Sequence, residues 1–186
     1  MPTDYPCFHT SRLTVLLPGT ELADVMLDYY RRNRAHLEVW EPRRSADFWT
    51  TGWWQRQLDY NRREYREDRG ARMAVMRREE PGRVVGIANL SNIIRGSFRA
   101  CHLGYSIDHE LEGGGFMFEA LEAVVQFAFE ELGLHRVMAN YQPDNERSGR
   151  LLERLGFERE GYARDYLFIN GAWRDHVLTS IVRPEG

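Results

Sequence analysis

Lysine is absent from this sequence of 186 residues, so that all 25 of its basic residues are arginine. Without lysine the chain has no Walker phosphate-binding loop, no Schiff base and no catalytic lysine amine. Cysteine is scarce as well, because only Cys7 and Cys101 occur. Two cysteines argue against a disulfide framework or a cysteine-based zinc site, and the histidines lack metal-ligand spacing. We therefore expect no metal site.

Long apolar runs are also missing. No run approaches the roughly 18–20 residues needed to span a bilayer. Residues 1–6 have neither a basic start nor an apolar core, which argues against a signal peptide. Nothing resembles an interdomain linker. The sequence predicts a cytoplasmic protein without a membrane partner, with an N-terminal extension at 1–10 and a single domain at 11–183.

Charge is distributed unevenly although its net value is only −3. Residues 31–78 contain 13 arginines and 7 acidic residues. Such a segment suits a phosphate-bearing cofactor or an RNA-rich particle, or it forms a solvated helical face held by salt bridges. We expect no sequence-specific contact with nucleic acid, since the net charge is negative and no recognition motif appears.

Periodicity and turn residues indicate strands between helices. Asn170-Gly171 is a strong signal for a two-residue hairpin. The expected strands are 12–17, 72–77, 84–90, 101–108, 136–141, 162–169 and 173–182. The expected helices follow Thr20 and cover 52–69, 116–132 and 145–155. This order predicts an α/β (α+β) fold in which helices flank a mixed central sheet.

A glycine triplet, Gly113-Gly114-Gly115, lies between the expected strand 101–108 and the helix 116–132. Consecutive glycines allow a ligand close to the backbone, and a helix N-terminus favours an anion there. The segment therefore suits a pyrophosphate. Its glycine spacing differs from that of a dinucleotide-binding fingerprint.

About thirty residues downstream, Asn145-Glu146-Arg147-Ser148 precedes Leu151-Leu152 and Gly156-Phe157. Together with the glycine loop, this segment resembles the two cofactor motifs of the GNAT superfamily of N-acetyltransferases. The resemblance implies the GNAT fold and acetyl-CoA as cosubstrate. It assigns cofactor binding to Tyr105, Ser106, Ile107, Gly113, Gly114, Gly115, Phe116, Met117, Asn140, Asn145, Ser148 and Leu152.

The resemblance extends over about 11–182 to the ribosomal-protein N-acetyltransferases of the RimJ/RimL group. It is carried by stretches that include Trp40-Glu41-Pro42, Leu103-Gly104-Tyr105-Ser106-Ile107 and Trp173-Arg174-Asp175-His176-Val177. It implies acetylation of the N-terminal alanine of a small-subunit ribosomal protein, and a link to that subunit. Two positions depart from the family, because Glu110 and Glu112 place carboxylates where basic or amide side chains are usual. We expect weaker binding of coenzyme A as a result.

Acetyl transfer to an amine requires a base and a proton donor for the thiolate. In many family members a tyrosine donates this proton, and the matching residue here is Leu152, which cannot. Ser148, one turn earlier on the same helix, is therefore the candidate proton donor. Tyr141 and Tyr166 are the other candidates. Glu41, Glu119 and Asp165 compete as the base, although Glu119 also suits the dipole of its helix. The resemblance implies that the acceptor amine meets Asn33, Trp40, Glu41 and Tyr166. We interpret the six histidines as structural.

Two other functions stay open. The cofactor motifs equally suit an acetyltransferase for a small amine, such as a polyamine, an amino acid or an aminoglycoside. A non-catalytic protein that binds coenzyme A and assists ribosome assembly would also retain them.

Overall fold

The structure is a computed structural model that describes residues 5–184. Its strands are β1 (Cys7–His9), β2 (Leu13–Leu16), β3 (Gly70–Arg77), β4 (Val84–Ile94), β5 (Ala100–Ile107), β6 (Arg136–Met138), β7 (Glu158–Ile169) and β8 (Ala172–Val182). Its α-helices are α1 (Ala23–Arg32), α2 (Arg34–Leu37), α3 (Thr51–Arg66), α4 (Phe116–Glu130) and α5 (Glu146–Arg154). Short 3-10 helices are η1 (Thr20–Leu22), η2 (Ala46–Trp49) and η3 (His109–Leu111).

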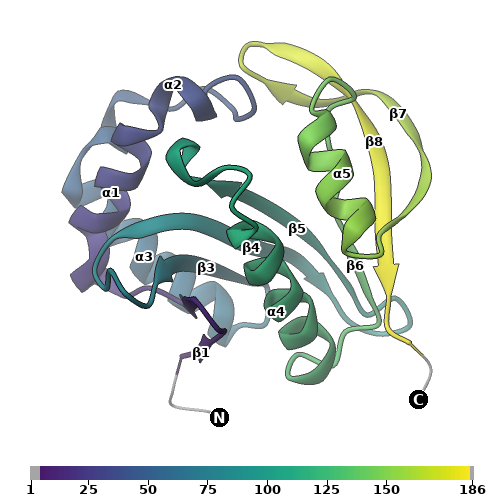
Figure 1. The fold of residues 1–186 in the computed structure, drawn as a ribbon, viewed down its shortest axis with the longest axis horizontal. Coiled ribbons are helices and arrows are strands. Elements are labelled where there is room, and N and C mark those ends of the chain that lie inside the picture. Colours follow the sequence, from purple (N-terminus) through teal and green to yellow (C-terminus); the bar gives the residue numbers. More distant parts are fainter. Residues whose placement is uncertain (1–4, 185–186) are drawn as a thin grey trace.

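All eight of these strands form one sheet in the order β1-β2-β3-β4-β5-β6-β8-β7. The β5 and β6 strands are parallel, and the other neighbours are antiparallel. A mixed sheet flanked by helices confirms the predicted fold class (Figure 1).

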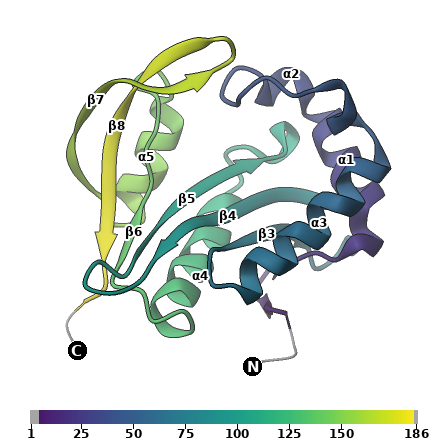
Figure 2. The same cartoon turned by 180° about the vertical axis from the view of Figure 1, so that it is seen from behind.

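Helices cover both faces of the strands in the N-terminal half of the sheet. The α4 helix lies on one face, and α1 and α3 lie on the other (Figures 1 and 2). The β3 strand shows the alternation that this arrangement requires. Met73 and Val75 belong to the apolar cluster around α4, whereas Ala74 and Met76 belong to the cluster around α1 and α3.

Local chemistry sets the ends of several elements. The Thr50 hydroxyl oxygen caps α3 by accepting a hydrogen bond from the Trp53 N–H at 3.3 Å. Gly133, three residues past the end of α4, adopts φ +62°. Asn170 and Gly171 both have positive φ, as a tight hairpin turn between β7 and β8 requires.

The sheet begins earlier than the sequence indicated. Cys7–His9 pairs with β2 as an edge strand, so part of the segment assigned to an N-terminal extension belongs to the sheet. Residues 1–4 of that predicted extension lie outside the described residues. None of the helices in the described part of the chain is both long and apolar enough to cross a membrane.

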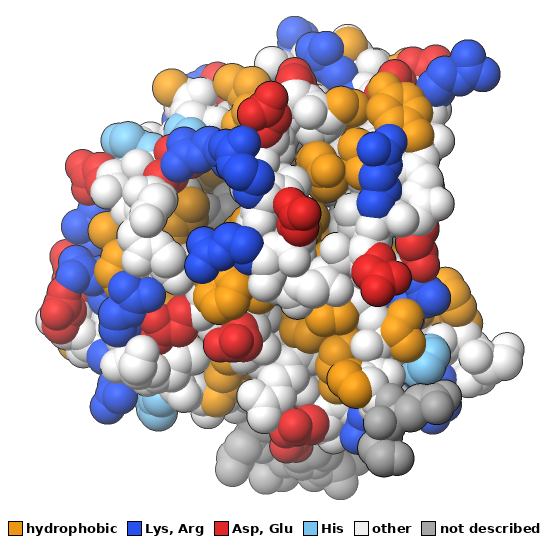
Figure 3. Space-filling model, turned by 45° about the vertical axis from the view of Figure 1, so that its right-hand side comes forward, with side chains coloured by type: hydrophobic (Ala, Val, Ile, Leu, Met, Phe, Trp, Pro, Cys, Tyr) orange, Lys and Arg blue, Asp and Glu red, His pale blue; other side chains and the backbone are white. Residues whose placement is uncertain are grey.

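Most arginines of residues 31–78 form ion pairs within the molecule. Examples are Arg63 with Asp59 at 3.0 Å and Arg72 with Glu64 at 3.0 Å. These ion pairs support the interpretation of the segment as a salt-bridged surface. On the different face that Figure 3 brings forward, basic side chains (blue) and acidic side chains (red) are also interspersed.

Candidate active site

The strands β5 and β6 pair over three residues and then separate. Their register joins Ala100 to Arg136 and ends with His102 and Met138. Beyond β6 the chain follows β8 instead, because Tyr141 and Val177 exchange backbone hydrogen bonds of 3.2 and 2.8 Å. The second half of β5 therefore has no neighbouring strand on this side, and a V-shaped gap opens (Figure 1).

The exposed edge of β5 carries backbone groups without a strand partner. The Asp108 N–H donates to the Val85 carbonyl at 2.7 Å, so the backbone of Asp108 points toward β4. Since successive residues of a strand direct their backbone groups to opposite sides, those of Tyr105 and Ile107 point into the gap, beyond the last β5–β6 pair. Such groups require a partner, which an extended amide-bearing ligand supplies.

The glycine loop lies at the end of this edge. Gly113 and Gly115 have φ values of +76° and +75°, a region that favours glycine. The Arg12 guanidinium holds the loop by donating to the Gly114 carbonyl at 3.0 Å. The first intrahelical bond of α4 runs from the Glu119 N–H to the Gly115 carbonyl, which leaves the amides of residues 116–118 free for an anion.

Basic side chains face this loop from α5. Arg147, Arg150 and Arg154 line the same cavity as the loop. The Arg154 guanidinium also lies 4.6 Å from the centroid of the Phe118 ring on α4. Free amides, glycines at positive φ and three arginines are the groups that hold phosphates, so this end of the cavity fits the pyrophosphate of acetyl-CoA.

Both carboxylates that depart from the family pattern are paired. Glu110 accepts a hydrogen bond from Arg83 at 3.0 Å. Glu112 contacts Arg147 on α5, and its second oxygen lies 3.4 Å from His36 Nε2 on α2. The charge of Glu112 is thus balanced by Arg147, but a phosphate at the loop has to share that arginine.

Ser148 lies in the first turn of α5. Asn145 caps the helix, and its Oδ1 accepts the Ser148 N–H at 3.1 Å. The Ser148 hydroxyl lies 2.7 Å from the Tyr105 hydroxyl on β5. Burial raises the pKa of Tyr105 to about 12, although the hydrogen bond with Ser148 acts in the opposite direction. The pair therefore consists of neutral hydroxyls that can donate to an anion such as a thiolate.

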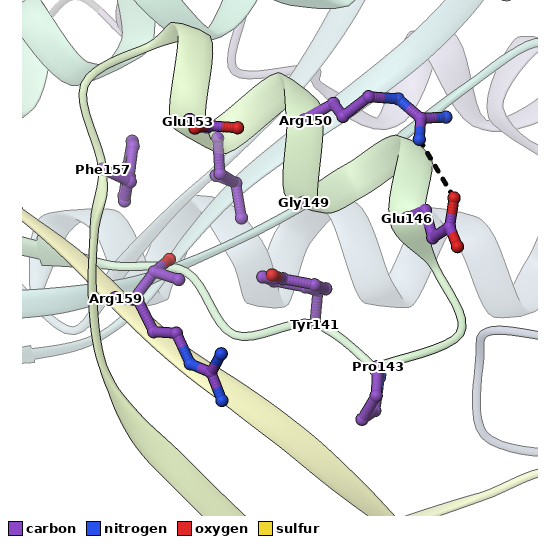
Figure 4. A pocket seen from close by; sticks show the side chains of 10 residues that line it. Tyr141, Pro143, Glu146, Gly149, Arg150, Glu153, Phe157 and Arg159 are labelled. Carbon is purple, nitrogen blue, oxygen red and sulfur yellow. Dashed lines mark hydrogen bonds and ion pairs between the residues drawn. The ribbon is translucent and has the colours of Figure 1, made fainter.

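A glycine allows α5 to lie close to the chain that follows β6. A Cβ atom on Gly149 would come within 2.9 Å of the Tyr141 ring. Tyr141 lines the main cavity and also a second pocket of about 470 Å³ on the other side of α5, where Arg150 pairs with Glu146 (Figure 4). Gly149 therefore fixes the distance between α5 and the wall of the gap.

Three polar side chains meet on the opposite side of the gap. Asn140 Nδ2 donates to the Tyr166 hydroxyl at 3.1 Å. The Tyr166 ring lies 5.3 Å from the His176 ring, centroid to centroid. His176 on β8 lines the cavity and is 4% exposed. His176 was not among the predicted site residues, and its only signal in the sequence is its position in a stretch that resembles the family.

The cavity between these two sides has a volume of about 770 Å³. Its wall near His176 is largely apolar, with Leu37, Trp40, Leu167 and Ile169. The predicted site residues that line it are Trp40, Tyr105, Ser106, Ile107, Gly113, Gly115, Phe116, Met117, Asn140, Asn145 and Ser148.

Other predicted residues do not line the cavity. Glu41 accepts a hydrogen bond of 2.5 Å from Arg44. Asp165 is exposed, with its N–H donating to the Asp175 carboxylate. Gly114 contributes its carbonyl to Arg12, and Leu152 is buried in the apolar core at 1% exposure. Neither of these two carboxylates, proposed as base or amine ligand, is therefore part of the cavity lining.

Asn33 and Tyr166 are not themselves part of the cavity lining. Asn33 is buried, and its Oδ1 accepts the His109 N–H at 3.0 Å while its Nδ2 donates to the Tyr29 carbonyl. It therefore ties the end of α1 to the start of the glycine-loop segment, and the substrate contact expected of it has no support here. Tyr166 reaches the cavity through its contact with Asn140.

Glu119, the remaining carboxylate considered as a base, is occupied by structural contacts. It accepts hydrogen bonds from Thr10, from Ser11 and from the backbone and side chain of Arg12. Burial acts to raise the pKa of Glu119, but these hydrogen bonds prevail and lower it to about 2. Its carboxylate therefore anchors the turn between β1 and β2 to α4. No cluster suited to a metal ion occurs among the described His, Cys, Asp and Glu residues.

This geometry defines a class of protein. One cavity is lined by the open edge of β5, by a helix N-terminus suited to phosphates and by the Ser148–Tyr105 hydroxyl pair. Part of its wall is apolar. The arrangement suits a long cosubstrate with phosphates at one end and a reactive acyl group at the other, and an acceptor that enters from the opposite side.

Comparisons with known proteins agree with this class. Residues 12–158 match the family described as "Acetyltransferase (GNAT) domain". The [Ribosomal protein uS5]-alanine N-acetyltransferase of Escherichia coli (strain K12) is 45% identical, over 95% of this chain and 90% of its own. The crystal structure of a ribosomal-protein-S5-alanine acetyltransferase from Vibrio fischeri is 38% identical, with a TM-score of 0.90 over 95% of this chain and 96% of its own.

A RimJ from Mycobacterium smegmatis in complex with CoA-disulfide is 28% identical, with a TM-score of 0.85 over 91% of this chain and 81% of its own. The chain therefore belongs to the GNAT acetyltransferase family. It is an acetyltransferase that uses acetyl-CoA as acetyl donor.

Proposed function

We propose that this protein acetylates the N-terminal alanine of a small-subunit ribosomal protein. The observation that carries the proposal is the extent of the similarity to the Escherichia coli enzyme, which reaches 95% of this chain. Similarity over that length includes α2, β7 and β8, which line the acceptor side, and is not confined to the cofactor motifs. The proposed substrate places the reaction in the cytoplasm.

Acetyl-CoA supplies an activated thioester carbonyl when it is bound. We assign its phosphates to the glycine loop and the α5 arginines, and its amide-bearing arm to the open edge of β5. Asn145, through its cap on α5, positions Ser148. The Ser148 hydroxyl, supported by Tyr105, supplies the proton to the departing sulfur.

The acceptor N-terminus enters between α2 and the β7–β8 hairpin in this proposal. Trp40 and Leu167 line that side of the cavity, and a small alanine side chain suits their apolar surface. Asn140 and Tyr166 lie deeper and offer hydrogen bonds to the acceptor backbone. Association with the assembled small subunit would follow from recognition of the same protein on the ribosome.

The test is release of free thiol from acetyl-CoA with a panel of acceptors. The panel holds peptides that start with alanine or serine, their pre-acetylated forms, polyamines and aminoglycosides. Turnover of the free alanine peptide, with none for its pre-acetylated form, is the expected result. Turnover of small amines alone would assign the protein to small-molecule acetylation. Silence with every amine, despite measurable binding of coenzyme A, would favour a non-catalytic assembly factor.

A further inference from the structure

The acceptor amine has to lose a proton before it can attack a thioester. An N-terminal amine has a pKa of about 7.7–8.0, so much of it is protonated near neutral pH. A group that takes this proton has to lie at the acceptor side of the cavity, within hydrogen-bond reach of the amine or one water away.

Among the residues that the structure describes, no carboxylate in the cavity lining lies at the acceptor side. Glu112 is the one acidic residue in the cavity lining, and it lies at the phosphate end, against Arg147 and His36. Glu41 and Asp165 lie outside the lining, and Glu119 is held by the turn between β1 and β2. The base therefore has to be sought among the other groups that line the cavity.

His176 has the required protonation pattern. Its Nδ1 lies 3.0 Å from the Arg174 carbonyl oxygen. A carbonyl oxygen only accepts hydrogen bonds, so Nδ1 carries the hydrogen, and the neutral ring keeps a free lone pair on Nε2. In the described part of the chain Nε2 has no hydrogen-bond partner. It is the nitrogen left to meet a ligand in the cavity.

Strand alternation places His176 on the side of the sheet opposite Ser148. Tyr141 is paired with Val177, and its ring lies under Gly149 of α5, so this pair faces α5. The neighbouring side chains, His176 and Asn140, consequently point to the other face. Ser106 lies on that face too, because its hydroxyl contacts the Tyr29 hydroxyl on α1 at 2.9 Å.

We propose that His176 Nε2 is the general base that takes the proton from the acceptor amine. The inference rests on the proposed function only in requiring that the acceptor be an amine. As the bond forms between the amine nitrogen and the acetyl carbon, the carbon–sulfur bond breaks. The amine proton goes to Nε2 on one side of the gap, and the sulfur receives the hydroxyl proton of Ser148 on the other. Nε2 then releases its proton to solvent and Ser148 takes one back from solvent, so that in net one proton passes from the amine to the sulfur and both residues are restored.

The test compares His176→Ala and His176→Gln with the wild type in the thiol-release assay. The matched control is His135→Ala, since His135 is an exposed histidine outside the cavity lining. We expect kcat to fall about 100-fold in both His176 variants, as loss of a general base typically produces. The KM for acetyl-CoA should change by less than about twofold, because the cofactor side is intact. His135→Ala should keep wild-type kcat.

Exogenous imidazole separates a base from a structural residue. The proposal predicts that imidazole raises the kcat of His176→Ala at least about tenfold, and leaves the wild type and His135→Ala unchanged. Folded His176 variants with kcat within about threefold of wild type would overturn it. A loss that imidazole does not restore in the alanine variant would also overturn it, and would give His176 a structural role.

These outcomes are separate from failure of the proposed function. If the wild type ignores the alanine peptide but acetylates another amine, the same variants are compared with that amine. Should His176→Ala fold poorly by circular dichroism, His176→Gln supplies the kcat comparison, because glutamine keeps a polar side chain of similar length but accepts no proton at working pH.

Discussion

The cofactor side and the acceptor side of the cavity are built in different ways. The cofactor side consists of a strand, a glycine loop, a helix and a capped second helix, each made of consecutive residues. The acceptor side combines α2 with β7 and β8, which are more than a hundred residues apart in the sequence. Binding on the cofactor side depends on backbone groups and helix ends, whereas binding on the acceptor side depends on single side chains that the sheet brings together.

This difference separates binding of the acetyl donor from recognition of the acceptor. The helix and glycine loop bind phosphates through features that every acetyl-CoA-dependent relative needs. Residues on the acceptor side can differ between relatives without loss of acetyl-CoA binding. Substitutions of binding residues should therefore change the KM for acetyl-CoA on one side and the KM for the acceptor on the other, whereas loss of a proposed proton donor or base, Ser148 or His176, should lower kcat.

The largest effect is expected on the cofactor side at Ser148. Ser148→Ala removes the hydroxyl 2.7 Å from Tyr105, and with it the proton donor for the departing sulfur. We expect kcat to fall about 100-fold with little change in the KM for either substrate. Steady-state kinetics with the alanine peptide measure both kcat and KM. Ser148→Thr, which keeps a hydroxyl, is the control and should retain most of the activity.

On the acceptor side, Trp40→Ala removes apolar surface from the cavity wall. We expect the KM for the peptide to rise about tenfold, which corresponds to loss of about 1.4 kcal/mol of binding. The KM for acetyl-CoA should stay within about twofold. A change confined to acetyl-CoA would contradict the division of the cavity into two sides.

The anchor of the glycine-loop helix gives a pH-dependent prediction. The pKa of Glu119 is lowered to about 2, so its contribution to stability is complete above the ordinary pKa of about 4.3. That contribution is lost as the pH falls from there toward 2. Glu119→Gln should reduce the free energy of unfolding by roughly 2–3 kcal/mol at pH 7.

Urea denaturation at a series of pH values measures this contribution. The difference between wild type and Glu119→Gln should shrink steadily below about pH 4. Glu122→Gln, on the same helix, is the control and should show no such trend. A difference that stays constant from pH 7 to pH 3 would contradict the account of Glu119.

The smallest kinetic effect is expected at Glu112, one of the two carboxylates that depart from the family pattern. Glu112→Gln frees Arg147 from its ion pair and removes a negative charge beside the phosphate site. We expect the KM for acetyl-CoA to fall about two- to fivefold, because partly exposed ion pairs contribute up to about 1 kcal/mol. Isothermal titration with coenzyme A checks this independently. An increase in KM would mean that Glu112 positions the loop.

The same contrast between the two sides explains which site residues could be predicted from the sequence. The glycine triplet was predicted as a phosphate site because strand, loop and helix signals are local, and the resemblance to the GNAT superfamily added Asn145 and Ser148. All of these residues but Gly114 line the cavity. The hairpin at Asn170 and Gly171 was predicted for the same reason. On the acceptor side, Trp40 lines the cavity, whereas Glu41 and Asp165 lie outside the lining.

His176 shows why the rest was not accessible to sequence reasoning. A single histidine in an alternating strand is indistinguishable from a structural one. Its position beside Asn140 depends on the pairing of Tyr141 with Val177, and its tautomer depends on the Arg174 carbonyl. The edge strand β1 was missed because three residues carry too little periodicity to read.

The most direct test of the account is mass spectrometry of an alanine-starting peptide after incubation with acetyl-CoA and the wild-type protein. The peptide should contain an internal lysine, so that the site of modification can be read from its fragments. The account predicts one acetyl group, on the α-amine of the alanine. Acetylation of the lysine side chain alone, or no acetylation while polyamines are modified, would contradict it.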